Sequence, residues 1–242
     1  MLKKVEGIII NDTNYGETSK IINILTDEGI IGVIAKGAKS IKSPLRSTTL
    51  NLTYGSFNIY YNENKLSTLK SADIINELKN IKKDIVLVSY MSFLCDLVSQ
   101  VMKQNDDKKI YDMLISTLLK INDGLNPMIM TNILELKLLD YLGVGISFNS
   151  CCKCGKTRGI VTIDPDAGGY ICKDCYTNEL YYDEKTLKML RMYYLVEISS
   201  ISDLKISDKV VNNINYFVNT YYDRYTGLYL KSKKFLNELI NQ

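Results

Sequence analysis

Residues 151–175 read CCKCGKTRGIVTIDPDAGGYICKDC and contain two Cys-x2-Cys pairs, Cys151 with Cys154 and Cys172 with Cys175. Seventeen residues separate the two pairs, a spacing typical of zinc ribbons and knuckles. The two-residue gap lets both thiolates of one pair face one metal ion, and four thiolates complete a tetrahedron at ~2.3 Å from zinc. Such a tetrahedron leaves no position for water. The sequence therefore predicts one structural Zn2+ held by these four cysteines.

Two other interpretations of the cysteines stay open at this point. The pairs can be unrelated buried or redox-active cysteines, or they can hold an iron–sulfur cluster, although such clusters usually place three cysteines close together. Cys152 lies too near Cys154 for the usual knuckle, and its role is open. Cys95 falls in an apolar helical pattern, where a cysteine usually packs as a small hydrophobic side chain.

The composition of the 242 residues excludes several classes of enzyme and metal site. There is no histidine, which excludes a histidine general base, a Ser-His or Cys-His nucleophile pair and a mixed Cys/His metal site. Neither a paired-carboxylate site nor a G-x4-G-K-[ST] phosphate loop stands out, so we expect a protein that is not an enzyme. The chain shows no signal-peptide core and no apolar run of ~20 residues, which predicts a cytoplasmic protein without a membrane segment.

The first 75 residues favour β-structure. Short apolar or alternating runs, separated by glycine and polar turns, predict five strands, with Asn11–Gly16 as the first turn. The predicted strands cover residues 5–10, 21–25, 30–35, 53–61 and 66–74. Five short strands at this spacing are typical of a small closed barrel, and an open sheet packed on a helix is the alternative.

The apolar period becomes helical after residue 75. Stripes at helical spacing run through residues 81–101 and 110–121, and Asn126-Pro127 begins a helix that Gly143 can end. Asp183 is a candidate N-cap for a helix reaching residue 198, Ser207 for one reaching residue 222, and Ser232 for one reaching residue 240. The sequence thus predicts a helical domain that is interrupted by the cysteine-rich segment.

A basic loop follows the third predicted strand. Between residues 29 and 62 there is no acidic residue, yet Lys36, Lys39, Lys42 and Arg46 recur at spacings of three or four. We interpret AKGAKSIKSPLRS, residues 35–47, as a mobile loop whose cations can contact phosphates, although four cations can also be a plain solvated surface. Four aromatic residues follow, which either stack on unpaired bases or fill the barrel core. They are Tyr54, Phe57, Tyr60 and Tyr61.

Several short motifs, in this order, resemble the recombination protein O (RecO) family of bacterial DNA repair. They begin with Gly7-Ile-Ile-Ile and Tyr15-Gly-Glu-Thr-Ser-Lys20, and continue through Leu25-Thr, Glu28-Gly and Ala35-Lys-Gly-Ala-Lys39 with Lys42-Ser. The cysteine pairs with Gly155, Gly168 and Gly169 are similar to the family's zinc segment. The ending Lys231-Ser-Lys-Lys-Phe-Leu236 is similar to its closing motif.

The resemblance implies an α+β chain in three parts. Residues 1–76 are expected to form an OB-fold, a nucleic-acid-binding β-barrel, and residues 77–242 an all-helical domain with a zinc-ribbon-like insert at 148–178. It also implies a non-enzymatic mediator that binds single- and double-stranded DNA and anneals complementary strands. The implied partners are the recombination protein RecR and, in many members, the C-terminal tail of single-strand DNA-binding protein (SSB). With them the family helps to load the RecA recombinase onto SSB-coated DNA.

Two hypotheses for function follow. In the first, the chain is a DNA-binding and annealing mediator, expected in the cytoplasm with the nucleoid, whose affinity comes from the four cations of the basic loop. In the second, it is a protein-interaction adaptor in which the helical domain and the zinc insert dock partners and DNA contact is secondary. A second basic cluster, Lys231–Lys234, belongs either to a C-terminal helix or to a second acidic contact.

Overall fold

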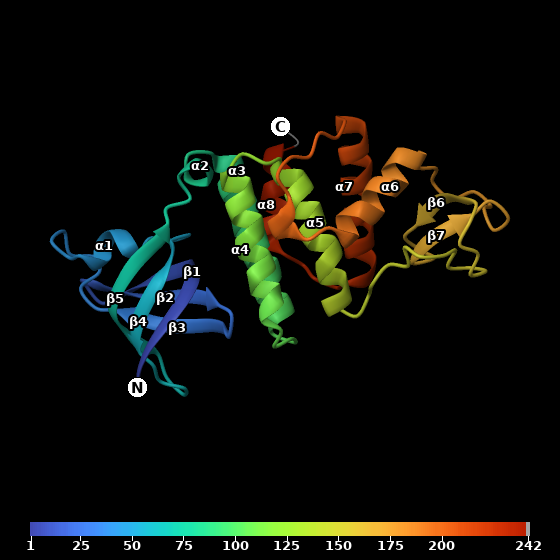
Figure 1. Ribbon diagram of the computed structural model, residues 1–242. Coiled ribbons are helices and arrows are strands. Elements are labelled where there is room, and N and C mark those ends of the chain that lie inside the picture. Colours follow the sequence, from blue (N-terminus) through green and yellow to red (C-terminus); the bar gives the residue numbers. More distant parts are fainter. Residues whose placement is uncertain (241–242) are drawn as a thin grey trace. The chain divides into compact units, whose positions relative to one another are not determined.

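The computed structural model describes residues 1–240 (Figure 1). The chain divides into two compact units. The first consists of residues 1–123 together with the C-terminal segment from Leu230, and the second is Gly124–Tyr229. β5, the last strand of the first unit, ends at Asn76 and α2 begins at Lys79, so the predicted boundary between residues 76 and 77 falls between these elements.

Five strands of the first unit close into a barrel in the order β1-β2-β3-β5-β4. They are β1 (Leu2–Tyr15), β2 (Ser19–Thr26), β3 (Gly29–Ala35), β4 (Tyr54–Tyr60) and β5 (Ser67–Asn76). All neighbouring strands are antiparallel except β3 and β5, which are parallel. The closed barrel, and with it the α+β class, is confirmed, and the open-sheet alternative is wrong.

Alternating apolar residues fill the barrel, because successive side chains of a strand point to opposite faces of the sheet. The buried cluster comprises Val5, Ile9, Ile22, Ile24, Val33, Ala35, Ala38, Phe57, Ile59 and Leu69. Glycine at residue 7 allows β1 and β2 to meet closely, because a Cβ on Gly7 would lie 2.6 Å from the Leu25 carbonyl oxygen. A side chain at Gly7 would therefore push β1 away from β2.

β1 is longer than the sequence predicts. The segment expected as a turn, Asn11–Gly16, continues the strand through Tyr15 and pairs with Ser19–Asn23, and only residues 16–18 turn. A bulge between Ile9 and Asn11 shifts the register there. Asn and Asp suggested a turn, but in this exposed hairpin arm the backbone of β2 satisfies their N–H and C=O groups, and local preference is overridden.

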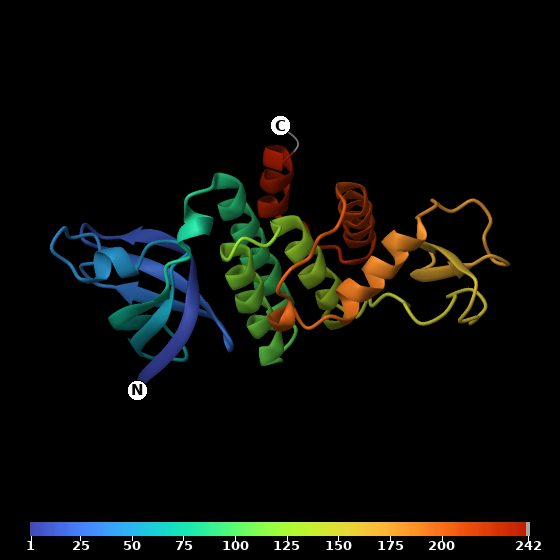
Figure 2. The same ribbon diagram turned by 45° about the horizontal axis from the view of Figure 1, so that its top comes forward.

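Helices complete the first unit. They are the single turns α1 (Leu45–Thr48) and α2 (Lys79–Lys82), then α3 (Ile85–Met102), α4 (Lys108–Asn122) and the C-terminal α8 (Lys231–Ile240). α8 packs against α3 although some 130 residues separate them in sequence (Figure 2). Ser232 does not cap α8 as predicted: the helix begins at Lys231, and the Ser232 hydroxyl donates to Asp96 Oδ2 on α3 at 2.7 Å.

α3 has the length and apolar composition of a membrane-spanning helix, the only such helix within residues 1–240. More than half of it is buried within the protein, including Phe93, Leu94 and Leu97. The core helix of a soluble protein has the same composition, so α3 by itself is weak support for a membrane segment.

The second unit holds α5 (Pro127–Tyr141), α6 (Glu184–Leu195), the short 3-10 helix η1 (Ile198–Ser200) and α7 (Asp208–Tyr225). Asn126 and Asp183 cap α5 and α6 as predicted, each accepting backbone N–H bonds through its side chain. α6 ends three residues before the predicted residue 198. The strands β6 (Ile160–Asp164) and β7 (Gly169–Cys172) form an antiparallel hairpin beside α6 (Figures 1 and 2).

Candidate metal centre and nucleic-acid interface

The β6–β7 hairpin places the two cysteine pairs. Cys172 ends β7, and the first pair lies against the same strand because the Cys152 N–H donates to the Tyr170 carbonyl at 2.8 Å. A close approach supports this arrangement: Tyr170 N–H donates to the Ser147 carbonyl at 3.1 Å, and a Cβ on Gly169 would lie 2.6 Å from that carbonyl oxygen. Glycine at residue 169 therefore allows the chain before the first pair to lie on the hairpin.

Each cysteine pair forms a tight hydrogen-bonded turn. Gly155 N–H donates to the Cys151 carbonyl at 2.8 Å, and Gly155 has a φ of +76°, which glycine adopts without strain. In the second pair, the N–H groups of Cys175 and Tyr176 both donate to the Cys172 carbonyl at 3.0 Å. Both turns bring the second cysteine of the pair back toward the first, as a shared metal requires.

The four predicted ligands meet. The Sγ atoms of Cys151, Cys154, Cys172 and Cys175 all lie within 4.8 Å of one another, with 3.6 Å between those of Cys154 and Cys172. A zinc ion ~2.3 Å from four tetrahedral sulfurs sets them about 3.8 Å apart. Within residues 1–240 this is the one group of three or more Cys, Asp or Glu side chains close enough to hold a metal ion. The donor set therefore fits a single thiophilic metal ion.

Protonation differs between the thiols of the cluster. Burial opposes ionisation of Cys151, but backbone N–H groups of Cys172, Cys154 and Lys153 point at its sulfur and lower its pKa. The pKa of Cys175 is raised, mainly because its thiol hydrogen-bonds Cys154 and because burial disfavours the thiolate. Four thiolates so close together repel one another unless a cation neutralises them, so the cluster gains most from a divalent metal ion.

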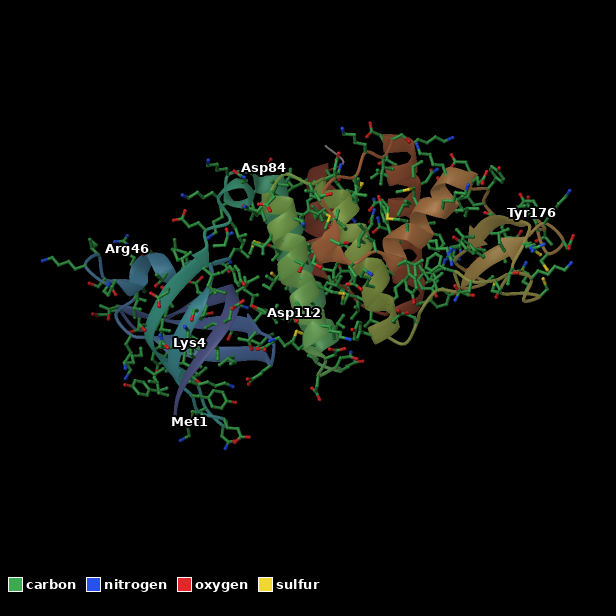
Figure 3. The ribbon with its side chains drawn as sticks, in the orientation of Figure 1. Met1, Lys4, Arg46, Asp84, Asp112 and Tyr176 are labelled. Carbon is green, nitrogen blue, oxygen red and sulfur yellow. The ribbon has the colours of Figure 1, made fainter. Side chains whose placement is uncertain are left out.

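Ion pairs hold the two turns together from outside. Lys153 Nζ lies 2.6 Å from Glu179 Oε1, and Lys156 Nζ lies 2.5 Å from Asp174 Oδ2. The pKa of Glu179 is lowered to about 2, first by the hydrogen bond from Lys153 and then by backbone N–H donors that include Thr177. Each pair joins the first cysteine turn to residues next to the second. Tyr176 extends from the end of the second turn (Figure 3).

The two other cysteines lie outside the cluster. Cys152 is exposed, and its thiol is not one of the four clustered sulfurs. Its contact with the hairpin is the backbone hydrogen bond from its N–H to the Tyr170 carbonyl. Cys95 is buried in α3, and this burial raises the pKa of its thiol to about 12. Its packing agrees with the predicted role as a small core residue.

The basic loop, residues 35–47, ends in the single turn of α1 and is ordered at its base. Gly37 N–H donates to Ser19 Oγ at 3.2 Å and Lys39 N–H to the Thr18 carbonyl at 2.8 Å, which joins the loop to the β1–β2 turn. Ala38, at 1% exposed, anchors the loop in the barrel core. The prediction of a mobile loop missed these contacts, because they link residues about 20 positions apart in sequence.

All four predicted DNA-contacting residues are exposed: Lys36, Lys39, Lys42 and Arg46. Within the described part of the chain, none of them forms an ion pair with a carboxylate. Arg46 extends from α1 at the rim of the barrel (Figure 3). The loop thus presents four uncompensated positive charges that can meet an anion.

The barrel aromatics divide between core and surface. Phe57 is fully buried and Tyr54 nearly so, with the Tyr54 hydroxyl donating to Glu6, so neither can stack on a base. Tyr60 is 52% exposed at the end of β4, and Lys3 Nζ lies 4.9 Å from the ring centroid of Tyr61. Of the four aromatic residues, therefore, Tyr60 is the freest.

Two exposed side chains near the basic loop were not anticipated from the sequence. Tyr15 ends β1 at 52% exposed, and Ile41 lies in the basic loop at 85% exposed. Ile41 stands among lysine, serine and proline, and a lone apolar residue in so polar a loop is the signal that could have identified it.

The C-terminal basic cluster is partly structural. Lys233 Nζ lies 5.2 Å from the ring centroid of Phe93, and Ser232 donates to Asp96, so both residues hold α8 on α3. Lys231 and Lys234 are exposed. The middle residues of the cluster thus contact α3, and a second acidic contact by the cluster stays a prediction.

Two family models cover nearly the whole chain. "Recombination protein O N terminal" matches residues 1–78, and "Recombination protein O C terminal" matches residues 82–234. Curated relatives agree in length and name. A Bacillus cytotoxicus protein named DNA repair protein RecO is 36% identical over 247 residues, which cover 99% of this chain and 98% of the relative. A protein of the same name from Listeria monocytogenes serotype 4b is 33% identical over 243 residues, covering 98% and 95%.

Proposed function

This chain belongs to the recombination protein O family of DNA repair proteins, and on that premise we propose that it is a non-enzymatic DNA-binding mediator of recombinational repair. It binds single- and double-stranded DNA, anneals complementary strands and, with RecR, helps to load RecA on SSB-coated DNA. We place it in the cytoplasm, associated with the nucleoid.

One observation carries this proposal: Lys36, Lys39, Lys42 and Arg46 project from an anchored loop and form no ion pair with a carboxylate of residues 1–240. Cations that are already paired gain little from a phosphate, whereas unpaired cations displace the counterions that surround DNA and gain their release. Phosphates repeat along every strand, so contacts of this kind bind DNA with little sequence preference. A mediator that acts on any broken chromosome needs DNA binding that does not depend on sequence.

The metal centre has a supporting role in this proposal. Cys151, Cys154, Cys172 and Cys175 would hold one Zn2+, which supplies no chemistry to a substrate because its four positions are filled by sulfur. The hairpin β6–β7 has strands of only five and four residues, and two-stranded hairpins are marginally stable alone. We therefore assign the ion the task of holding this insert in one conformation.

Partner docking is a second function that the second unit can support. Leu180, Tyr181 and Tyr216 are each more than half exposed, and Leu180 and Tyr216 line a cleft of about 380 Å³ together with Arg224. Exposed apolar and aromatic groups around a polar cleft are typical of protein interaction sites. The adaptor hypothesis places RecR or the SSB tail on the helical region, and family membership supports both as partners.

The test of the proposal is binding to a fluorescent single-stranded oligonucleotide by anisotropy. We expect the quadruple variant K36A/K39A/K42A/R46A to bind at least about a hundredfold more weakly at low salt, because four phosphate contacts are lost. A matched variant, K79A/K108A/K188A/K205A, removes the same charge from exposed lysines that already have carboxylate partners.

This control variant should bind nearly as the unchanged chain does. If both quadruple variants bind alike, net charge rather than the basic loop determines affinity, and the assignment of these residues is wrong. If the unchanged chain binds no oligonucleotide but still captures RecR, the adaptor hypothesis replaces the mediator.

A further inference from the structure

The two unanticipated side chains lie on joined segments of the barrel. Tyr15 pairs with Ser19 at the end of the β1–β2 hairpin, and the loop that carries Ile41 is bonded to the same turn through Thr18 and Ser19. Two hydrogen bonds within the loop, from Ser40 N–H to the Gly37 carbonyl at 3.0 Å and from Ser43 N–H to the Ser40 carbonyl at 3.1 Å, flank Ile41. The loop therefore holds Ile41 outward in a defined turn.

Charge around these side chains favours nucleic acid over an apolar protein surface. Lys39 and Lys42 flank Ile41 in sequence, Lys36 and Arg46 lie on the same basic loop, and all four cations are exposed. The adjoining β1–β2 turn contributes one acidic residue, Glu17. A protein partner for Ile41 would have to cover an apolar tip surrounded by uncompensated cations, whereas a nucleic acid supplies phosphates for the cations and apolar base faces for the tip.

Base faces are accessible only in unpaired DNA. In a duplex the bases are stacked inside, so an isoleucine or tyrosine at the surface meets them only where a step is opened. In a single strand the bases are free, and stacking or wedging by apolar side chains tolerates any sequence because every base has a flat apolar face. Side chains of this kind next to phosphate-binding cations thus discriminate by strandedness rather than by sequence.

We propose that Ile41 and Tyr15 contact unpaired bases while the surrounding cations hold the phosphates, and that these two side chains give the chain a preference for single-stranded DNA over duplex. The inference rests on the proposed function, since it names the bases as the target of the same loop. It also assigns the two kinds of contact to different residues: affinity for any DNA comes from the cations, and the preference comes from Ile41 and Tyr15.

The experiment compares Ile41→Ser and Tyr15→Ser with the unchanged chain, each titrated into a fluorescent oligothymidine and into a hairpin duplex of the same charge. Because each substitution removes one contact with a base face, we expect it to weaken binding to the single strand about tenfold. Binding to the duplex should change by less than about twofold, since its phosphate contacts remain. Thermal melting of each variant checks the fold, which exposed positions should leave unchanged.

Ile75→Ser is the matched control, because Ile75 is also an exposed isoleucine of the barrel, at 48%, but lies on β5 outside the basic loop. It should leave both affinities unchanged. A second readout is photocrosslinking of a 5-iodouracil oligonucleotide, which should attach to Tyr15 in the unchanged chain and equally in Ile75→Ser.

The outcomes separate the two proposals. If the quadruple loop variant loses DNA but Ile41→Ser and Tyr15→Ser keep their affinity for the single strand, the proposed function stands and this inference is overturned. Equal weakening on single strand and duplex overturns it too, because the residues then shape the loop instead of reading bases. If the unchanged chain binds no DNA, the proposed function itself fails. Loss of a protein partner with intact DNA binding assigns Ile41 to a protein interface and overturns the inference.

Discussion

Removal of the metal ion should destabilise the second unit far more than the first. The perturbation is Cys154→Ser, which removes one of four sulfurs that lie within 4.8 Å of one another. The matched control is Cys152→Ser, two residues away, whose exposed thiol lies outside the cluster. Both substitutions exchange a thiol for a hydroxyl in the same turn, so a difference between them reports metal ligation alone.

The size of the effect follows from linkage. A ligand present at about a thousand times its Kd stabilises the folded state by ~4 kcal/mol, and this stabilisation is lost with the site. The unit that holds the cluster, Gly124–Tyr229, has the size of a small domain. For such a domain 1 kcal/mol shifts Tm by ~4–8 °C, so we expect its transition to fall by roughly 15–30 °C. Strong chelation of the unchanged chain should lower it similarly.

The assay combines elemental analysis with thermal unfolding. We expect about one zinc ion per chain in the unchanged protein and in Cys152→Ser, and little in Cys154→Ser. Replacement by Co2+ should give the absorption of a tetrahedral thiolate site. Metal-free protein that melts as the loaded protein does would refute the structural role. Equal metal content in the two serine variants would refute the ligand assignment.

Three further predictions concern separate features of the molecule. With four phosphate contacts on a single strand, the slope of log affinity against log salt should be about −2.8. Affinity should therefore fall roughly fiftyfold between 50 and 200 mM salt. A slope near zero in salt titrations would contradict phosphate binding. Tyr193→Phe should raise the free energy of unfolding by ~1 kcal/mol, because the fully buried Tyr193 hydroxyl has no hydrogen-bond partner in the described residues. If urea unfolding shows that Tyr193→Phe is less stable than the unchanged chain, the hydroxyl has a partner. Asp183→Ala should lower the free energy of unfolding by ~1 kcal/mol, because it removes the cap of α6. Since the hydrogen bonds from Thr186 lower the pKa of Asp183, this stabilisation should be present above the unfolded pKa and vanish as pH falls through the folded pKa. An equal loss of stability at pH 2 and pH 7 would contradict that cause.

The sequence predicted what depends on local spacing. The Cys-x2-Cys pairs, the caps Asn126 and Asp183 and the alternating strands of the barrel each span a few residues, and the structure has them close to where they were expected. Even so, zinc as the metal stays a prediction, because sulfur geometry fits other thiophilic ions. DNA contact by the basic loop also stays a prediction.

Features that depend on distant contacts could not be predicted. The hydrogen bonds from Lys39 to Thr18 and from Ser232 to Asp96 join residues that lie far apart in the sequence. No local sequence pattern indicates such contacts. α5 shows the same limit: it is buried on nearly every side, so no apolar stripe marks which face meets which neighbour. The burial of Phe57 beside the exposed Tyr60 was likewise decided by strand register, which the sequence alone left open.

Annealing of two complementary oligonucleotides measures whether the chain brings single strands together through the basic loop. The unchanged chain should accelerate annealing, and K36A/K39A/K42A/R46A should lose this acceleration while K79A/K108A/K188A/K205A retains it. Annealing at the same rate by the folded loop variant, or no acceleration by the unchanged chain at low salt, would show that the basic loop does not bring strands together.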